Sequence, residues 1–306
     1  MKVAIMGAGG VGGYCGGLLA RKGEEVTFVA RGPHLEAIRE KGLHVRSVHG
    51  DFLISPARAT ADPAEVGPVD LVLFTTKTYH TEMAAQAIKP MIGRETVVVP
   101  LQNGIDAAEV IGGHVGAEHL VAGVTWLSAA IEAPGVVGQY SQFRRIVFGE
   151  IDGKMTARLK AIYEALQGTG ITVEMSDNIL RVLWTKFVFI SSVSAIGSLA
   201  RVSFGDYRNI PEARAVLTDA IEEVAAVARA RGVRLEGDVV SKTLEFIDNS
   251  APNIKPSMQR DVEAGRPSEL ESLIGIVARL GRQTRVPTPV MSLAYGMLKP
   301  GDLKAS

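Results

Sequence analysis

The apolar positions in the first half of the chain fall in short runs separated by turn residues, a pattern typical of alternating strands and helices. The nearly all-apolar run at residues 69–75 is typical of a central strand in a parallel sheet. Strands are expected at residues 2–6, 25–30, 69–75, 96–101, 120–130, 135–140, 145–149 and 171–175. Turn residues predict one hairpin around Gly50-Asp51 within 44–55 and another at Pro134-Gly135. A helix is expected at 155–167.

The second half shows helical periodicity with almost no strand signal from Asp177 onward. Helices are expected at residues 178–196, 210–231, 237–249, 257–264, 269–284 and 289–298. Ser268 and Glu271 have the spacing of a capping box, which would place Glu269 in a first helical turn. The pattern therefore predicts an α/β domain over residues 1–176 and an all-α domain over 177–306.

Composition narrows the functional classes without identifying one. The chain has 306 residues, and its 46% hydrophobic and 22% charged residues are ordinary for a soluble globular protein. With 33 basic and 33 acidic residues the formal net charge is zero, which argues against binding to nucleic acid or to an anionic membrane surface. The lone Cys15 excludes an internal disulfide, and we expect neither a signal peptide nor a run able to span a bilayer. No histidine lies at a metal-binding spacing, so we expect no metal site, and we expect a cytoplasmic location.

A glycine-rich turn follows the first predicted strand and opens the first helix. Its residues are Gly7, Ala8, Gly9, Gly10, Val11 and Gly12. In a Rossmann-like dinucleotide-binding domain the first glycine allows the tight turn, the second lets a diphosphate approach the backbone, and the third lets the helix pack closely on the strand. The diphosphate then meets free N–H groups at the positive end of the helix. A glycine-rich turn without a ligand is the alternative.

Polar residues follow the next predicted strands. The second strand ends in Ala30-Arg31, where an NAD site usually offers a carboxylate, so Arg31 favours NADP(H). Lys77 follows the strand at 69–75, and Asn103-Gly104 follows the strand at 96–101. Ligands bind at the carboxyl ends of the strands in open α/β sheets. Arg31 as a solvated loop residue, and Asn103 as a simple turn residue, stay open as alternatives.

A single lysine, Lys186, lies within the apolar helix expected at 178–196. Its neighbours one turn away are Val182, Leu183, Phe189 and Ile190. An ammonium on such a face either reaches water along its aliphatic stem or loses hydration, in which case its pKa falls toward a range useful for proton transfer. Glu269 likewise has two interpretations, a functional acid or a carboxylate that complements a helix dipole.

These motifs together resemble the ketopantoate reductase (2-dehydropantoate 2-reductase) family. The resemblance rests on Lys77, Asn103-Gly104, Trp184-Thr-Lys186 and the run from Ser257 to Glu269, and it spans nearly the whole chain. It implies NADPH-dependent reduction of a small 2-oxo acid, 2-dehydropantoate, to pantoate, a step toward pantothenate and coenzyme A.

The resemblance also implies roles for individual residues. The glycine turn and Arg31 would hold NADP(H), with Lys77, Asn103 and Ala129 on its nicotinamide side. Lys186 would be the proton donor, with Glu269 beside the lysine and the cofactor. Residues implied to bind substrate are Asn103, Ser257 and Ser194. Hydride delivery to a ketone builds negative charge on oxygen, and a cation that can release a proton serves both needs.

The sequence departs from the family at positions that commonly carry asparagine, where it has Ile190, Ser194 and Phe204, and Asn253 is one residue out of register. Losing a polar partner changes discrimination between substrates strongly. A different, more apolar 2-oxo acid is therefore one alternative, and a related hydroxyacid dehydrogenase is another. A non-catalytic NADP-binding sensor is the third, although it would not need Lys186 or Glu269. The long apolar helices of the second domain are compatible with a homodimer.

Overall fold

The computed structural model describes residues 1–305, which form two units. The α/β unit comprises Met1–Gln102 and Asp106–Ile179, and the helical unit comprises the chain from Leu180 together with Asn103–Ile105. The change of unit after Ile179 lies close to the boundary expected at residue 176. The inclusion of Asn103–Ile105 in the helical unit is not evident from the sequence, because these residues follow a strand of the α/β unit.

The α/β unit contains strands and helices in alternation. Its strands are β1 (Lys2–Met6), β2 (Glu25–Val29), β3 (Leu43–Ser47), β4 (Phe52–Ile54), β5 (Arg58–Thr60), β6 (Leu71–Phe74), β7 (Val97–Pro100), β8 (Ala122–Trp126), β9 (Ala129–Ala133), β10 (Val136–Gln139), β11 (Arg145–Gly149) and β12 (Thr172–Met175). Its α-helices are α1 (Gly10–Lys22), α2 (Gly32–Lys41), α3 (Thr81–Ala87), α4 (Ala107–Val115) and α5 (Ala157–Leu166). Short 3-10 turns are η1 (Pro63–Glu65), η2 (Thr78–His80), η3 (Lys89–Met91) and η4 (Ala117–His119).

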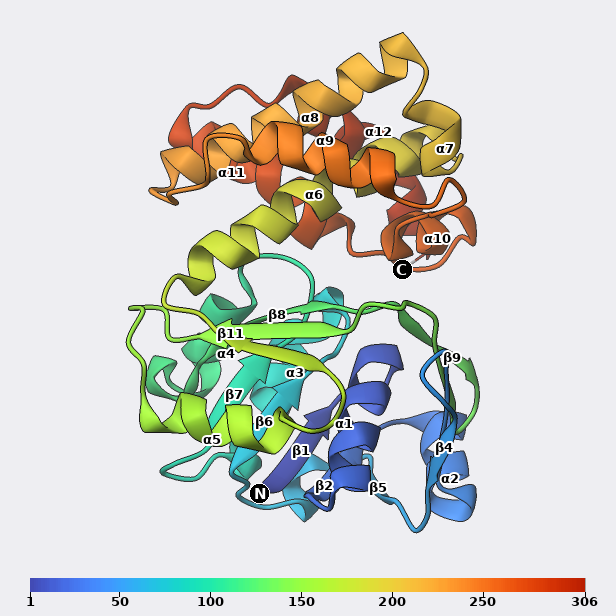
Figure 1. The fold of residues 1–306 in the computed structure, drawn as a ribbon, viewed down its shortest axis with the longest axis vertical. Helices are drawn as coiled ribbons and strands as arrows, with labels where there is room; N and C mark the ends of the chain where they lie inside the picture. The colour runs from blue at the N-terminus through green and yellow to red at the C-terminus, as the bar shows by residue number, and fades with distance from the viewer. Residues whose placement is uncertain (306) are drawn as a thin grey trace. The chain divides into compact units, whose positions relative to one another are not determined.

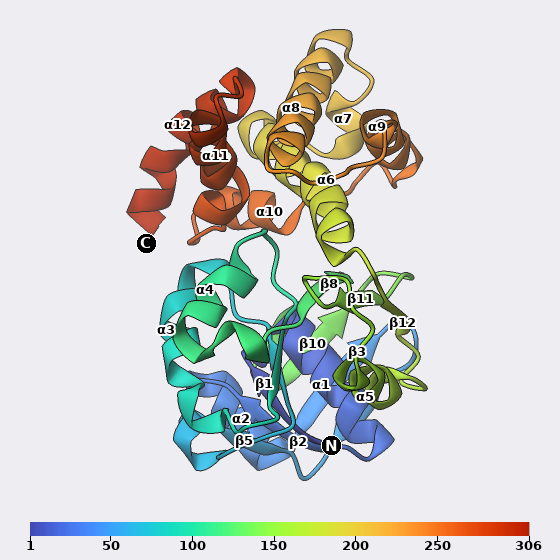
Figure 2. The ribbon, with the colours of Figure 1, turned by 90° about the vertical axis from the view of Figure 1, so that its left-hand side faces the viewer.

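A parallel five-stranded sheet in the order β5-β2-β1-β6-β7 is the centre of this unit. Strands β6 and β7 are buried along their whole length, which explains their nearly continuous apolar sequence. Alternate residues of β1 contribute to two different core clusters, Val3 and Ile5 to one and Ala4 and Met6 to the other. Figure 2 shows α1 on one side of the sheet and α3 and α4 on the other. The predicted Rossmann-like architecture is confirmed.

Two smaller sheets complete the unit, in the orders β4-β3-β10-β9 and β12-β11-β8. The hairpins predicted around Gly50-Asp51 and at Pro134-Gly135 are confirmed as the antiparallel pairs β3–β4 and β9–β10. The single strand expected at 120–130 is wrong, because the chain passes from one sheet to another there. Ser128 lies between β8 and β9, and two hydrogen bonds fix it there: its N–H donates to the Ser141 hydroxyl, and its carbonyl oxygen accepts from the Tyr140 N–H.

The helical unit contains no strand among its described residues, which confirms the all-α prediction (Figure 1). Its elements are α6 (Ile179–Ala200), α7 (Phe204–Tyr207), α8 (Pro211–Ala230), α9 (Val239–Asn249), α10 (Ser257–Glu263), the π-helical turn η5 (Glu271–Gly275), α11 (Ile276–Thr284) and α12 (Pro289–Ala305). Buried side chains from α6, α8, η5, α11 and α12 form one apolar core.

The capping box predicted at Ser268 and Glu271 is wrong. The Ser268 hydroxyl instead donates to Asp302, 2.7 Å away in α12, and the Glu271 carboxylate accepts from Tyr295 and Lys299. The chain then makes the π-helical turn η5 before α11 begins. Helix α12 continues past Pro300, beyond its expected end at residue 298, and Asp302 is one of the residues that anchor this extension.

Helix α6 corrects another expectation from the sequence. Judged by length and composition alone, Ile179–Ala200 could cross a membrane, since an 18-residue window within it has a mean hydropathy of 1.6. However, 56% of that window is buried within the fold, which is what the core helix of a soluble protein also shows. The feature is therefore weak evidence for a membrane span.

Glu223 in α8 connects two helices of this unit. Its carboxylate oxygens accept from the N–H groups of Val290, at 2.8 Å, and Met291, at 2.9 Å, in the first turn of α12. Burial raises the pKa of Glu223, and the two backbone N–H groups oppose that rise. Glu223→Ala leaves both N–H groups unpaired, so we expect the free energy of unfolding to fall by about 1–3 kcal/mol. Chemical denaturation measures the loss. The exposed neighbour Glu222→Ala is the control, and equal effects of the two changes would contradict the assignment.

Candidate active site

The glycine turn has the geometry of an anion-binding loop. Gly7 has φ of +99°, which glycine alone adopts readily, and a side chain on Gly12 would collide with the Gly7 carbonyl oxygen. Beside Gly9, by contrast, there is open space. Gly9 caps α1 without a side-chain hydrogen bond, and the first backbone bond of the helix runs from Gly13 to Gly9. The N–H groups of the first turn therefore have no acceptor within the helix, which fits a diphosphate at this end.

The other residues of the turn shape it. Ala8 is buried, its N–H donates to the Val29 carbonyl oxygen, and its methyl group belongs to the core. A side chain on Gly10 would lie 2.4 Å from the carbonyl oxygen of Ala129, so β9 lies directly against the turn. The structure thus brings Ala129 to the glycine turn. Val11 is half-buried at the start of α1.

His34, which no local pattern in the sequence singles out, supports the glycine turn from α2. Its Nδ1 accepts from the Gly135 N–H at 3.0 Å, so its Nε2 carries the hydrogen and donates to the Ala8 carbonyl oxygen at 2.9 Å. Burial lowers the pKa of His34, while the bond to Ala8 raises it. A neutral histidine thus connects the glycine turn to the β9–β10 hairpin.

We expect His34→Ala to weaken the binding of NADPH and of NADH equally, by about tenfold, because the turn that both diphosphates need loses a hydrogen bond. Fluorescence titration of each reduced cofactor measures the effect. His114, which contacts Glu82 on α3, is the matched control position. Unchanged affinities in His34→Ala would show that the turn keeps its shape without the imidazole.

Positive charge gathers beyond the carboxyl end of β2. Arg31 is exposed and caps the N-terminus of α2, and the first turn of α2 has no acidic residue. Arg31 is also close enough to His80, in η2 after β6, to help burial lower the pKa of His80. Lys77 immediately precedes η2 and is half-buried. This corner of the α/β unit is suited to a phosphate group.

The helical unit contains a chain of three polar groups in apolar surroundings. The Lys186 ammonium donates to Oδ1 of Asn103 at 2.9 Å, and Nδ2 of Asn103 donates to the Glu269 carboxylate at 3.3 Å. Glu269 is 4% exposed. Asn103 therefore links the lysine to the acid, an arrangement that spacing in the sequence does not reveal. Ile105, from the same short segment, packs against the core of this unit.

The environment of Lys186 decides its protonation chemistry. Burial lowers its pKa from the usual lysine range to about 8, and the negative charge of Glu269 opposes that fall. Two of the three ammonium hydrogens have no acceptor among residues 1–305. The group is therefore protonated at neutral pH, can release its proton readily, and has hydrogens available for a substrate oxygen.

The other candidate residues of the helical unit are not part of the chain formed by Lys186, Asn103 and Glu269. Ser257 is half-buried at the start of α10, and no hydrogen bond among the described residues joins it to Lys186, Asn103 or Glu269. Ser194 is fully buried, about 12 Å along α6 from Lys186, which argues against direct contact with a substrate. Phe204 is a core residue packed edge-on against Phe189, so its departure from asparagine reflects packing.

No group of three potential metal ligands occurs among residues 1–305.

The class of protein follows from two features. One is a glycine turn at the edge of a parallel sheet, and the other is an all-α unit that holds a partly buried lysine, an amide and a carboxylate. Together they define a two-domain dinucleotide-dependent oxidoreductase. The family model for ketopantoate reductase PanE/ApbA matches residues 3–153, and the family model for the C-terminal domain of ketopantoate reductase PanE/ApbA matches residues 178–302. The chain therefore belongs to the ketopantoate reductase family, whose members are NAD(P)-dependent reductases of small 2-oxo acids.

Individual relatives match over nearly their whole length. The chain is 30% identical to an uncharacterized oxidoreductase, YkpB, of Bacillus subtilis over 299 residues, covering 98% of each chain. It is 31% identical to 2-dehydropantoate 2-reductase of Halobacterium salinarum over 295 residues, 95% of each. Among solved structures, a PanE/ApbA family ketopantoate reductase from Ralstonia eutropha is 32% identical with a TM-score of 0.92, covering 100% of this chain and 99% of that one.

Proposed function

We propose that the protein reduces 2-dehydropantoate to pantoate with NADPH, in the biosynthesis of pantothenate and coenzyme A, with Lys186 as the proton donor. The observation that carries the proposal is the Lys186–Asn103–Glu269 chain, which joins a lysine of lowered pKa to a buried carboxylate in a member of this family. A non-catalytic NADP-binding sensor has no use for that arrangement.

NADP(H) is the cofactor that fits the α/β unit best. The N–H groups at the start of α1 would bind the diphosphate. Arg31 and the positive end of α2 would bind the 2'-phosphate, at the position where an NAD site would offer a carboxylate. Lys77 and Ala129 would lie toward the nicotinamide. The reduced nicotinamide supplies a hydride to the ketone carbon when the cofactor is bound.

The residues of the helical unit would manage the charge that develops on the ketone oxygen. The Lys186 ammonium donates a hydrogen bond to that oxygen and then transfers the proton to it, which gives the alcohol. Asn103 orients the ammonium, and Glu269 keeps the amine protonated until substrate arrives, because its charge raises the pKa of Lys186. Ser257 would bind the substrate itself, whereas Ser194 would act only if the core around it opened.

The pH dependence of the reaction follows from Lys186. The donor form is the protonated one, so kcat/KM for reduction should stay level below about pH 8 and fall about tenfold per pH unit above it. For the reverse oxidation Lys186 must be deprotonated, so kcat/KM should rise through the same range. Steady-state rates in both directions measure the two profiles. A reduction profile that stays level to pH 10 would exclude Lys186 as the titrating donor.

A more apolar 2-oxo acid is the second candidate substrate, because Ile190, one turn from Lys186, is apolar and half-buried where the family commonly has asparagine. A panel of 2-oxo acids with the pure protein and NADPH tests both candidates through kcat/KM. The proposal expects 2-dehydropantoate to lead. If a larger aliphatic or aromatic 2-oxo acid gave the highest kcat/KM, that acid would replace 2-dehydropantoate as the proposed substrate. Tight NADPH binding with no oxidation by any acid would support the sensor instead.

A further inference from the structure

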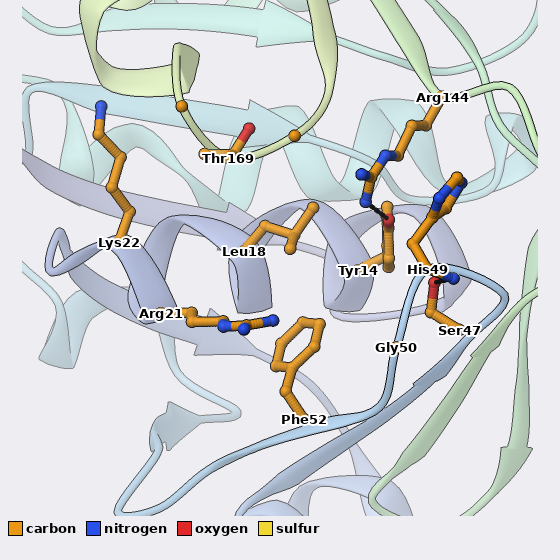
Figure 3. Close-up of a pocket in the computed structure, with 12 residues that line it drawn as sticks. Tyr14, Leu18, Arg21, Lys22, Ser47, His49, Gly50, Phe52, Arg144 and Thr169 are labelled. Carbon is orange, nitrogen blue, oxygen red and sulfur yellow. Dashed lines mark hydrogen bonds between the residues drawn. The ribbon is translucent and has the colours of Figure 1, made fainter.

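A cavity of the α/β unit, of about 310 Å³, lies along the C-terminal half of α1 and has no part in the proposed reaction. We call it the basic pocket; the residues used below are Tyr14, Arg21, Lys22, His49, Arg144 and Thr169. They come from α1, from the turn between β3 and β4, from the residue before β11 and from the turn between α5 and β12 (Figure 3). With a rise of 1.5 Å per residue, Arg21 lies about 16 Å along α1 from Gly10, so this pocket is separate from the glycine turn.

The charge of the basic pocket is positive and not neutralised by the protein. No Asp or Glu lines it, and within residues 1–305 neither Arg21, Lys22 nor Arg144 makes an ion pair. The guanidinium of Arg21 lies 5.2 Å from the centre of the Phe52 ring, and the Lys22 ammonium donates to backbone carbonyl oxygens of Glu164 and Ala165. The C-terminal end of α1 contributes only about half a negative charge, which three cationic side chains exceed.

Arg144 and Tyr14 are hydrogen-bonded to each other at one side of the pocket. Tyr14 is 0% exposed, and its hydroxyl oxygen accepts from Nη1 of Arg144 at 2.8 Å (Figure 3). The Tyr14 hydroxyl hydrogen has no acceptor of its own in the part of the chain that the structure describes. A buried donor without an acceptor is costly, and an anion in the pocket would satisfy it.

The turn opposite α1 is shaped around the guanidinium. Gly170 has φ of +86°, and a side chain there would lie 2.6 Å from Nη2 of Arg144. Thr169, beside it, adds a hydroxyl to the lining, and its Oγ1 donates to the Leu166 carbonyl oxygen. His49 donates through Nε2 to the Gln142 carbonyl oxygen at 3.0 Å. The absence of a side chain at Gly170 thus leaves room for the Arg144 guanidinium in the wall of the pocket.

We propose that the basic pocket is a binding site for a small phosphorylated compound. A phosphoryl group accepts several hydrogen bonds at once, which matches the forked guanidinium of Arg144, the Tyr14 hydroxyl and the nearby charge of Arg21. Leu18 and Phe52 offer apolar surface for the organic part of a phosphate ester. Inorganic phosphate shares the phosphoryl chemistry and is the simplest probe of the site.

Isothermal titration of inorganic phosphate into the full-length protein saturated with NADPH tests the proposal, because the cofactor then fills the glycine turn and Arg31. We expect saturable binding of one phosphate per chain, weakened at least about tenfold in Arg144→Gln and also weakened in Arg21→Gln. Arg46→Gln, at an exposed position of β3 outside the pocket, is the control and should bind as the wild type does. Glycerol 3-phosphate distinguishes the sources: tighter binding than phosphate identifies an ester, and equal binding identifies the free anion.

Two results would overturn the proposal. One is the absence of saturable binding by either probe when sodium chloride holds the ionic strength constant. The other is equal affinity in the wild type and in both pocket variants. Arg21→Gln keeps the second result decisive if Arg144→Gln does not fold, because Arg21 is exposed and its replacement leaves the hydrogen bond between Arg144 and Tyr14 intact.

Discussion

Lys186→Ala is expected to lower kcat by about 10²–10⁴-fold while the affinity for NADPH stays within a factor of two or so of the wild type. The change removes both the proton donor and the positive charge that meets the ketone oxygen, and neither belongs to the α/β unit that would bind the cofactor. The loss should appear equally in kcat and kcat/KM, because the interaction strengthens in the transition state. Stopped-flow rates at saturating NADPH, with a parallel fluorescence titration of the cofactor, measure both quantities.

Lys186→Arg separates the two contributions of the lysine. Arginine keeps the charge but does not release its proton, so a rate as low as that of Lys186→Ala assigns the effect to proton transfer. Lys304→Ala, at an exposed position of α12, is the matched control and should leave turnover unchanged. Near-normal turnover in Lys186→Ala would mean that the lysine is an ordinary side chain on an apolar face.

Arg31→Ala is expected to weaken NADPH about 10–100-fold and NADH little, because one charge-assisted contact to the 2'-phosphate is lost. The ratio of the two dissociation constants is the decisive quantity, since a general disturbance of the glycine turn would weaken both cofactors alike, as expected for His34→Ala. Titration of each cofactor at physiological ionic strength measures the ratio.

Arg58→Ala is the matched control for Arg31. Arg58 lies on β5, beside β2, and its exposed guanidinium pairs with Glu25. Replacing it removes the same charge from the same unit, but away from the end of β2 where the ribose is expected. Equal losses for NADPH and NADH in Arg31→Ala, or an equal loss of selectivity in Arg58→Ala, would remove the argument for NADP(H).

Local patterns in the sequence were sufficient for the glycine turn and for Lys186. The turn is recognisable because strand, glycines and helix are contiguous, and φ of +99° at Gly7 is a local requirement. Lys186 is recognisable because a helix of period 3.6 places apolar neighbours around it. The all-α half was equally accessible, since its helices begin and end at turn residues that adjoin them in the chain.

Contacts between distant parts of the chain could not be predicted in the same way. Asn103 follows a strand, and nothing local indicates that it joins the helical unit and bridges Lys186 to Glu269. His34 acts through Ala8 and Gly135, 26 and 101 residues away. Ser194 shares a helix face with Lys186, but burial depends on which helices cover that face two turns further along.

The transfer of deuterium from NADPH labelled at the reactive C4 position to 2-dehydropantoate tests the central claim most directly. One experiment with the pure wild-type protein examines cofactor, substrate and reaction together, and mass spectrometry of the product measures it. The proposed function predicts pantoate carrying one deuterium on C2, formed in step with NADPH oxidation. Bound NADPH that stays reduced in the presence of 2-dehydropantoate, or pantoate without the label, would contradict it.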